Sequence, residues 1–142
     1  MRCVTSVALL AVMAAPALAQ QEPRLWVDGA WARPQADVAR PSAAYARLVN
    51  HGSDTIVIRR IGCSTAGRAE IHETVTENGM VRMRQVAQLS VAPGDTASLR
   101  PGGMHVMLMA LRTPLVAGQT FTCTLFVRGG GHVDAEFTVR AP

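Results

Sequence analysis

The sequence predicts an all-β protein that forms an antiparallel sandwich or barrel with Greek-key connections. Two observations lead to this fold class. The chain divides into many short segments rich in β-branched and apolar residues, and turn-forming residues separate them. No stretch of useful length shows the 3.6-residue period of an amphipathic helix.

The N-terminal residues have the features of a secretory signal peptide. One Arg precedes an apolar run at residues 4–15, and a proline followed by small residues lies at 16–19. We therefore expect residues 1–19 to be removed on export to the periplasm. The alternative is an uncleaved membrane anchor, but the run is shorter than the roughly 20 apolar residues that span a bilayer. Cys3 precedes the run, so we do not expect it to become the lipid-modified first residue of a lipoprotein.

The remaining chain has the size of one domain. Removal of the first 19 of 142 residues leaves 123, enough for a single hydrophobic core and too few for two ordinary domains. We expect this domain to be residues 20–142. The formal net charge of the chain is +4, and its arginines are scattered rather than clustered. This pattern is not typical of a nucleic-acid-binding surface.

Nine strands are expected along the domain, each bounded by turn chemistry. The polar turn at 50–54 separates the second strand from the third, and Asn78-Gly79 separates the fourth from the fifth. Turns rich in Gly and Pro at 92–95, 101–103 and 129–131 delimit the later strands. The expected strands lie near residues 25–33, 43–50, 55–63, 70–76, 81–89, 96–99, 105–111, 120–127 and 133–139.

The Asn78-Gly79 pair is the strongest local signal in the chain. Asn-Gly between two strand-like runs predicts a two-residue type I′ turn, and that turn sets the register of the hairpin. In this register Thr74 opposes Met83, which makes Met83 the diagonal neighbour of His72 on the same face. Diagonal neighbours lie about 7 to 8 Å apart, so an imidazole and a thioether placed in this way can bind one ion.

A second candidate element is the segment MHVMLM at residues 104–109. Strand alternation puts His105, Met107 and Met109 on one face and Met104 on the other. Methionine also fills irregular gaps in hydrophobic cores. The segment taken alone is therefore compatible with a metal site and with simple core packing.

The two elements together supply four candidate ligands with complementary chemistry. Two imidazole nitrogens and two thioether sulfurs form a neutral, soft donor set, which suits Cu(I) and fits Zn, Ca or Mg poorly. The candidate metal ligands are His72, Met83, His105 and Met107.

The spacing of these four residues resembles the His-x10-Met-x21-His-x-Met signature of the periplasmic copper chaperones called PCu(A)C. The resemblance covers most of the mature chain and implies a cupredoxin-like β-barrel that holds one Cu(I) through the four candidate ligands. It also implies delivery toward the copper site of cytochrome c oxidase, with the apo form of oxidase subunit II and Sco-type thiol proteins as partners. Matching context lies at residues 30–33 (AWAR), 43–45 (AAY), 69–73 (AEIHE), 82–84 (RMR) and 99–109 (LRPGGMHVMLM).

Residues near the candidate ligands are expected to have supporting or structural roles. Glu70 and Thr74 share the face of the first histidine and are candidates to orient its ring. Met109 is expected to pack in the core. Met80 flanks the turn. It is expected to be either a partly exposed turn residue or an auxiliary metal ligand. The other two histidines are expected to face solvent: His51 and His132.

Two cysteines remain after the signal peptide. In an oxidising compartment Cys63 and Cys123 are expected to form a disulfide, and a pair of thiolate metal ligands is the alternative. Neither stands in the short Cys, His, Met grouping that an electron-transfer cupredoxin requires. No nucleophile elbow, His-Glu-x-x-His motif or catalytic triad is apparent. We therefore expect a carrier rather than an enzyme, with copper tolerance or storage, or a metal-free β-sandwich interaction module, as the alternatives.

Overall fold

The computed structural model describes residues 24–142, and the predicted signal peptide at residues 1–19 lies outside this part of the chain. The described part consists of β-strands joined by turns and loops, and it holds no helix long and apolar enough to cross a membrane. The strands are β1 (Leu25–Ala32), β2 (Ser42–Asn50), β3 (Ile56–Cys63), β4 (Ala66–Glu77), β5 (Met80–Gln85), β6 (Leu89–Val91), β7 (Thr96–Leu99), β8 (His105–Leu111), β9 (Thr120–Val127) and β10 (His132–Val139).

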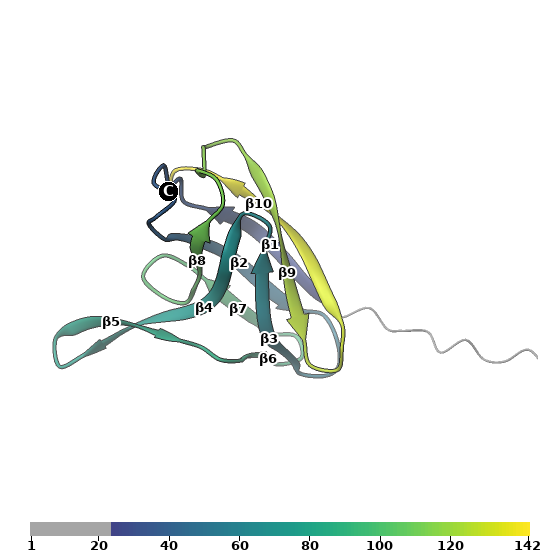
Figure 1. Cartoon of the computed structure of the whole chain (residues 1–142). Coiled ribbons are helices and arrows are strands. Elements are labelled where there is room, and N and C mark those ends of the chain that lie inside the picture. The colour runs from purple at the N-terminus through teal and green to yellow at the C-terminus, as the bar shows by residue number, and fades with distance from the viewer. Residues whose placement is uncertain (1–23) are drawn as a thin grey trace, which may run out of the picture.

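Seven of these strands close into a barrel (Figure 1). Their order around it is β4-β8-β2-β1-β10-β9-β3, and the barrel closes where Ile61 of β3 pairs with Ala69 of β4. Neighbours run antiparallel except for β1 and β10, which are parallel. Closure leaves β5 beside β4, β6 beside β3 and β7 beside β2 as additional strands. The all-β fold class is thus confirmed, and of the two predicted architectures the barrel is the one observed.

The barrel interior is filled by the inward-pointing residues of alternating strands. On β8, Val106 and Leu108 are fully buried, whereas their neighbours His105, Met107 and Met109 lie on the other side of the strand. The predicted alternation of this segment is therefore confirmed. Its histidine and two of its methionines lie on the outer side of the barrel wall rather than in the core.

A disulfide links two strands of the barrel. Cys63 of β3 and Cys123 of β9 oppose each other directly and are joined by a disulfide bond. Both are buried in the hydrophobic core. The predicted disulfide is confirmed, and its sulfurs are not free thiolates. Neither residue can therefore supply the thiolate that the copper site of an electron-transfer cupredoxin requires.

One predicted strand is wrong. The segment expected as a single strand at 81–89 divides into β5 and β6. The break comes at Val86, whose N–H donates to the carbonyl of Ile71 at 2.8 Å, after which the chain passes from β4 to the edge of β3. The residue pattern of one segment carries no information about this change of partner. The preceding strand, β4, is also longer than the predicted 70–76, because its first half pairs with β8 and its second half with β5.

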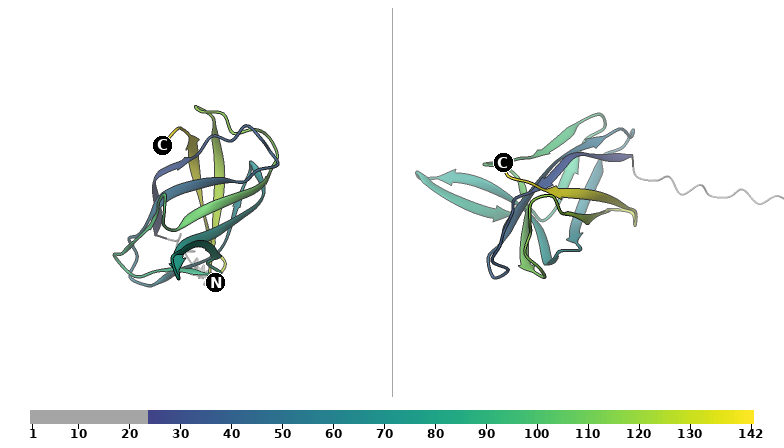
Figure 2. Two further views of the ribbon diagram at one scale, coloured as in Figure 1. Left: turned by 90° about the vertical axis from the view of Figure 1, so that its left-hand side faces the viewer. Right: turned by 90° about the horizontal axis from the view of Figure 1, so that it is seen from above.

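The β4–β5 hairpin extends beyond the barrel as an arm, which is clear in Figure 1 and in the right-hand view of Figure 2. Asn78 and Gly79 have φ values of 52° and 75°, as a type I′ turn requires. All the predicted cross-strand pairs are present, including Thr74 with Met83. Every residue of β5 is exposed. The register of this β4–β5 arm is therefore confirmed.

Candidate metal centre

His72 lies at the point where the pairing of β4 changes from β8 to β5. It opposes His105 on β8 and Gln85 on β5. Side chains on its face therefore have neighbours on both adjacent strands. This position makes His72 the centre of the candidate site.

The two histidines face each other across the β4–β8 pair. Their ring centroids are 6.1 Å apart, and the ring planes are inclined by 41°. One ion bound to a nitrogen of each ring can span this separation, since metal–nitrogen bonds are about 2 Å long in protein sites such as those of zinc. His105 is buried, and His72 is mostly so, with 15% of its side chain exposed.

The two candidate sulfur ligands come from opposite sides of His72. Met83 opposes Thr74 on the β4–β5 arm and is the diagonal neighbour of His72. Met107 opposes Glu70 on β4, so it is the diagonal neighbour of His72 on β8. The register thus places the four predicted ligands on one face of three adjacent strands. Whether they bind a metal stays a prediction.

A cavity of about 530 Å³ lies at this face, and Met83, His105 and Met107 line it. Met107 is half-buried there, and its partner on β2 is the small residue Ala43. Met83 is 60% exposed on the arm. The site therefore has a buried end at His105 and an open end at Met83.

The loop before β8 orients His105. The carbonyl oxygen of Gly103 lies 3.0 Å from Nδ1 of His105 and also accepts the N–H of Thr74 at 3.3 Å. A carbonyl oxygen can only accept, so Nδ1 of His105 carries a proton, and in the neutral ring Nε2 keeps a lone pair. The contact with Thr74 ties this loop to β4.

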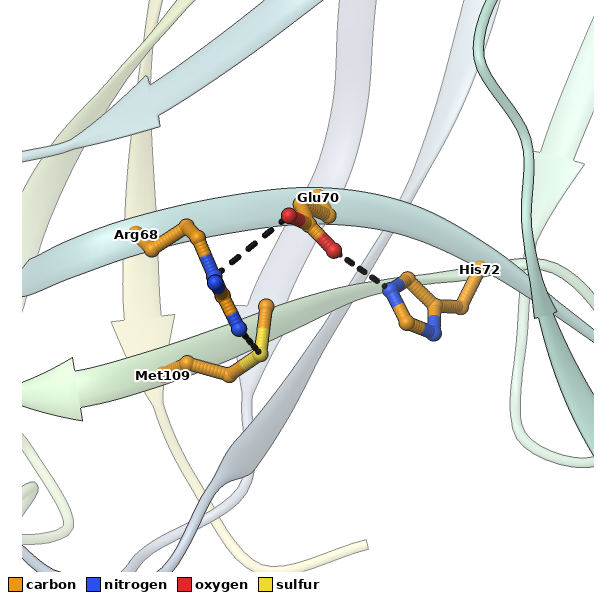
Figure 3. Close-up of polar contacts among 4 residues, drawn as sticks. All are labelled: Arg68, Glu70, His72 and Met109. Carbon is orange, nitrogen blue, oxygen red and sulfur yellow. Dashed lines mark hydrogen bonds and ion pairs between the residues drawn. The ribbon is translucent and has the colours of Figure 1, made fainter.

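The other histidine is oriented by a carboxylate (Figure 3). Oε2 of Glu70 lies 2.9 Å from Nε2 of His72, while Oε1 lies 3.4 Å from Nε of Arg68. Nδ1 of His72 is buried and has no hydrogen-bond partner among residues 24–142. Of the two residues predicted to orient this ring, Glu70 therefore makes the contact. Thr74 instead contributes its backbone N–H to Gly103.

Arg68 was missed by the sequence interpretation. It lies on the same face of β4 as Glu70 and His72, and its Nη2 is 3.2 Å from the sulfur of Met109. The period-two alternation of β4 could have placed Arg68 on this face. Its contact with Met109 depends on the pairing of β4 with β8, which opposes the two residues.

The prediction that Met109 packs in the core is wrong. Because Val106 and Leu108 point inward, Met109 lies on the outer face, half-exposed, with its sulfur near Arg68. Met104, on the inward side, packs against the core. Met80 is 53% exposed beside the turn. The predicted solvent-facing positions are confirmed for His51 and His132.

The opposite face of the arm carries an ion pair. Nη2 and Nε of Arg84 lie 2.6 and 3.0 Å from Oε1 of Glu73. The hydrogen bond from Glu73, followed by its charge, raises the pKa of Arg84. Since Glu73 and Arg84 oppose each other directly, the pair supports the register of the arm without contributing to the candidate site.

No three His, Cys, Asp or Glu side chains come together as a metal cluster within residues 24–142. The candidate site holds only two such residues besides the Glu70 carboxylate that contacts His72. The other predicted ligands at this face are the thioethers of Met83 and Met107. Thioethers are soft ligands, and they suit Cu(I) rather than hard cations.

Comparison with known proteins gives both a family and a fold. A family model described as "Putative lipoprotein LpqE-like" matches residues 25–139. The putative lipoprotein Lxx21020 of Leifsonia xyli subsp. xyli is 36% identical over 100 residues, which make up 70% of this chain and 60% of that protein. An uncharacterized protein of Rickettsia prowazekii is 31% identical over 100 residues, or 55% of its length. The chain thus spans less than two thirds of the length of the curated relatives it matches.

Solved structures share the barrel. The solution structure of the Cu(I) form of DR1885 from Deinococcus radiodurans is 31% identical, with a TM-score of 0.62, over 86% of this chain and 81% of that one. The copper-bound PCuAC domain from PmoF2 has a TM-score of 0.69 at 18% identity, over 84% of this chain and 94% of that one. At this identity the second likeness concerns the fold alone. The cupredoxin-like barrel expected from the sequence is thereby confirmed.

Proposed function

The chain belongs to the LpqE-like family of putative lipoproteins, and we propose that it is an exported copper carrier that holds one Cu(I). The observation that carries this proposal is the position of His72 between two strands that each bring a methionine to its face. The proposed ligands are His72, Met83, His105 and Met107.

The comparisons support copper as the cargo. A relative with 31% identity over most of its length was solved in a Cu(I) form, and a PCuAC domain with the same fold was solved with copper bound. The ligand chemistry of this chain points the same way. Two neutral imidazoles and two thioethers match the preference of Cu(I) for soft donors, and the set adds no charge of its own.

The geometry suits transfer rather than catalysis. Met83 is exposed on the β4–β5 arm, whereas His105 is buried at the other end of the site. A partner thiolate would displace Met83 first and then reach the ion, while the histidines still hold it. We propose that the protein is not an enzyme and that the acceptor is the copper site of cytochrome c oxidase subunit II, directly or through a Sco-type thiol protein.

The proposed location is the periplasm, after removal of residues 1–19. The Cys63–Cys123 disulfide supports an oxidising compartment, because such bonds are rare in reducing cytoplasm. Fractionation of cells that express the full chain, followed by mass measurement of the mature form, tests this part of the proposal. Recovery of the uncleaved chain from the cytoplasm would contradict it.

The first test is a titration of residues 20–142 with Cu(I) against a colorimetric chelator. One tightly bound equivalent is expected, without the intense blue absorption that a thiolate site would give with Cu(II). If a folded sample takes no Cu(I) from the chelator, the copper proposal fails and the metal-free interaction module becomes the better assignment. Oxidase assembly in a deletion strain separates delivery from copper tolerance or storage.

A further inference from the structure

We propose that Glu70 is a positioning residue that makes the two histidines present different ring nitrogens to the metal, Nδ1 from His72 and Nε2 from His105. The identity of the ion rests on the proposed function. The proton positions, by contrast, are a property of the metal-free protein and can be measured without copper.

The contact between Glu70 and His72 sets the first proton. Oε2 of Glu70 is 2.9 Å from Nε2 of His72, and the two side chains are only 23% and 15% exposed. An ionised carboxylate accepts hydrogen bonds and cannot donate them. The proton of the neutral ring therefore lies on Nε2, and Nδ1 is left with its lone pair.

The second nitrogen of His72 is independently marked as the free one. Nδ1 is buried and lacks a hydrogen-bond partner among the described residues. Figure 3 shows this atom on the side of the ring turned away from Glu70. Buried polar atoms in proteins are nearly always paired, so an exception at a candidate site calls for a ligand. A copper ion bound to Nδ1 would supply it.

His105 is held with the opposite arrangement. Its Nδ1 donates to the carbonyl of Gly103 at 3.0 Å, which leaves Nε2 with the lone pair. His72 and His105 oppose each other across β4 and β8 with ring centroids 6.1 Å apart, and we expect opposite tautomers to let both free nitrogens serve one ion. Two hydrogen bonds from different parts of the chain thus prepare the same site.

Arg68 holds the carboxylate in place. Its guanidinium lies 3.4 Å from Oε1 of Glu70 and 3.2 Å from the sulfur of Met109. Glu70 is therefore fixed between Arg68 on one side and His72 on the other (Figure 3). Arg68 itself is 65% exposed, so we expect its loss to affect the site less than the loss of Glu70.

The test is nitrogen-15 NMR of the imidazole rings in the metal-free mature protein. The spectra are recorded at a pH of about 8, because a free imidazole titrates near 6.5. We expect a single tautomer at each site, with the proton on Nε2 of His72 and on Nδ1 of His105. A proton on Nδ1 of His72 in the wild-type protein would overturn the proposal.

Variants separate positioning from simple structural support. In Glu70→Ala, His72 should become a mixture of tautomers and Cu(I) affinity should fall about 10- to 100-fold, as for other residues that orient metal ligands. Glu70→Gln leaves a single acceptor oxygen for both Arg68 and His72, so both properties should lie between those of the wild type and of Glu70→Ala. The matched control is Glu77→Ala, which removes an exposed carboxylate from the other face of the same strand and should change neither. Unchanged tautomer and affinity in a folded Glu70→Ala protein would contradict the proposed role.

These outcomes also distinguish the inference from the proposed function. If the wild-type protein shows the expected tautomers but binds no Cu(I), copper carriage fails while the role of Glu70 in setting the ring stands. If it binds Cu(I) with both histidines in the same tautomer, copper carriage stands and the inference fails. Addition of Cu(I) should shift the Nδ1 signal of His72 and the Nε2 signal of His105 most strongly.

Discussion

His72 and His105 oppose each other directly on β4 and β8, with their ring centroids 6.1 Å apart. The two residues are separated by more than thirty positions in the sequence. The pair lies where β4 leaves the barrel wall and continues into the β4–β5 arm. The two candidate methionines come from different neighbours of β4, so each is best tested separately.

Replacement of either methionine should weaken Cu(I) binding without unfolding the protein. Loss of a residue that only orients a ligand typically costs about 10- to 100-fold in metal affinity, so Met83→Leu and Met107→Leu should each cost at least about tenfold. Chelator competition measures the affinity, and thermal unfolding checks the fold. The matched control is Met80→Leu, an exposed methionine on the opposite face of β5. Wild-type affinity in both test variants would refute the ligand assignment.

Strain in the turn of the arm should weaken the site at a distance. Gly79 has a φ of +75°, and its substitution by Val forces a side chain into the left-handed region. We expect Gly79→Val to speed amide hydrogen exchange in β5 and to lower Cu(I) affinity, because β5 carries Met83. Gly94 has the same φ of +75° in the turn before β7, so Gly94→Val imposes comparable strain elsewhere. Equal loss of Cu(I) affinity in the two variants would contradict a specific role for the arm.

The disulfide should matter for stability and leave copper binding intact. Cys63 and Cys123 are 60 positions apart, and closing a loop of this length contributes about 4 kcal/mol in the chain-entropy model. The double substitution Cys63→Ala/Cys123→Ala should lower the free energy of unfolding in urea by about that amount. The folded variant should still bind one Cu(I), since both sulfurs lie in the core. Loss of the copper equivalent in a folded variant would show that the cysteines contribute to the site.

The buried side chain of Asn50 should contribute to the stability of the fold through its hydrogen bonds. Nδ2 of Asn50 donates to the carbonyls of Asp54 and Val91, and its Oδ1 accepts the N–H of Gly52 at 2.8 Å. Asn50→Ala removes all three hydrogen bonds and leaves the buried carbonyl of Val91 without this partner, so the free energy of unfolding should fall by about 1 to 3 kcal/mol. Ser53→Ala in the same turn is exposed and should change stability by less than about 0.5 kcal/mol. Similar urea midpoints for both variants would contradict this role of Asn50.

Local patterns predicted the arm well. The Asn78-Gly79 turn and the two-residue period of the strands are sufficient to place Met83 diagonal to His72, since both features depend only on neighbouring residues. The same period placed Met107 with His105. The prediction failed where the pattern had two meanings. Alternation correctly put Met109 on the face of His105, but that face lies outside the core, and the segment at 81–89 belongs to two strands with different partners.

The sequence by itself determined most of the strand pattern, the register of the β4–β5 arm and the chemistry of the four candidate ligands. Only the tertiary structure decided that β8 lies beside β4, which brings His105 opposite His72 and Met107 opposite Glu70. The physical reason is that pairing between strands far apart in the chain follows from closure of the whole barrel and burial of its core. A short segment records which face its side chains share, and it does not record which strand that face will meet.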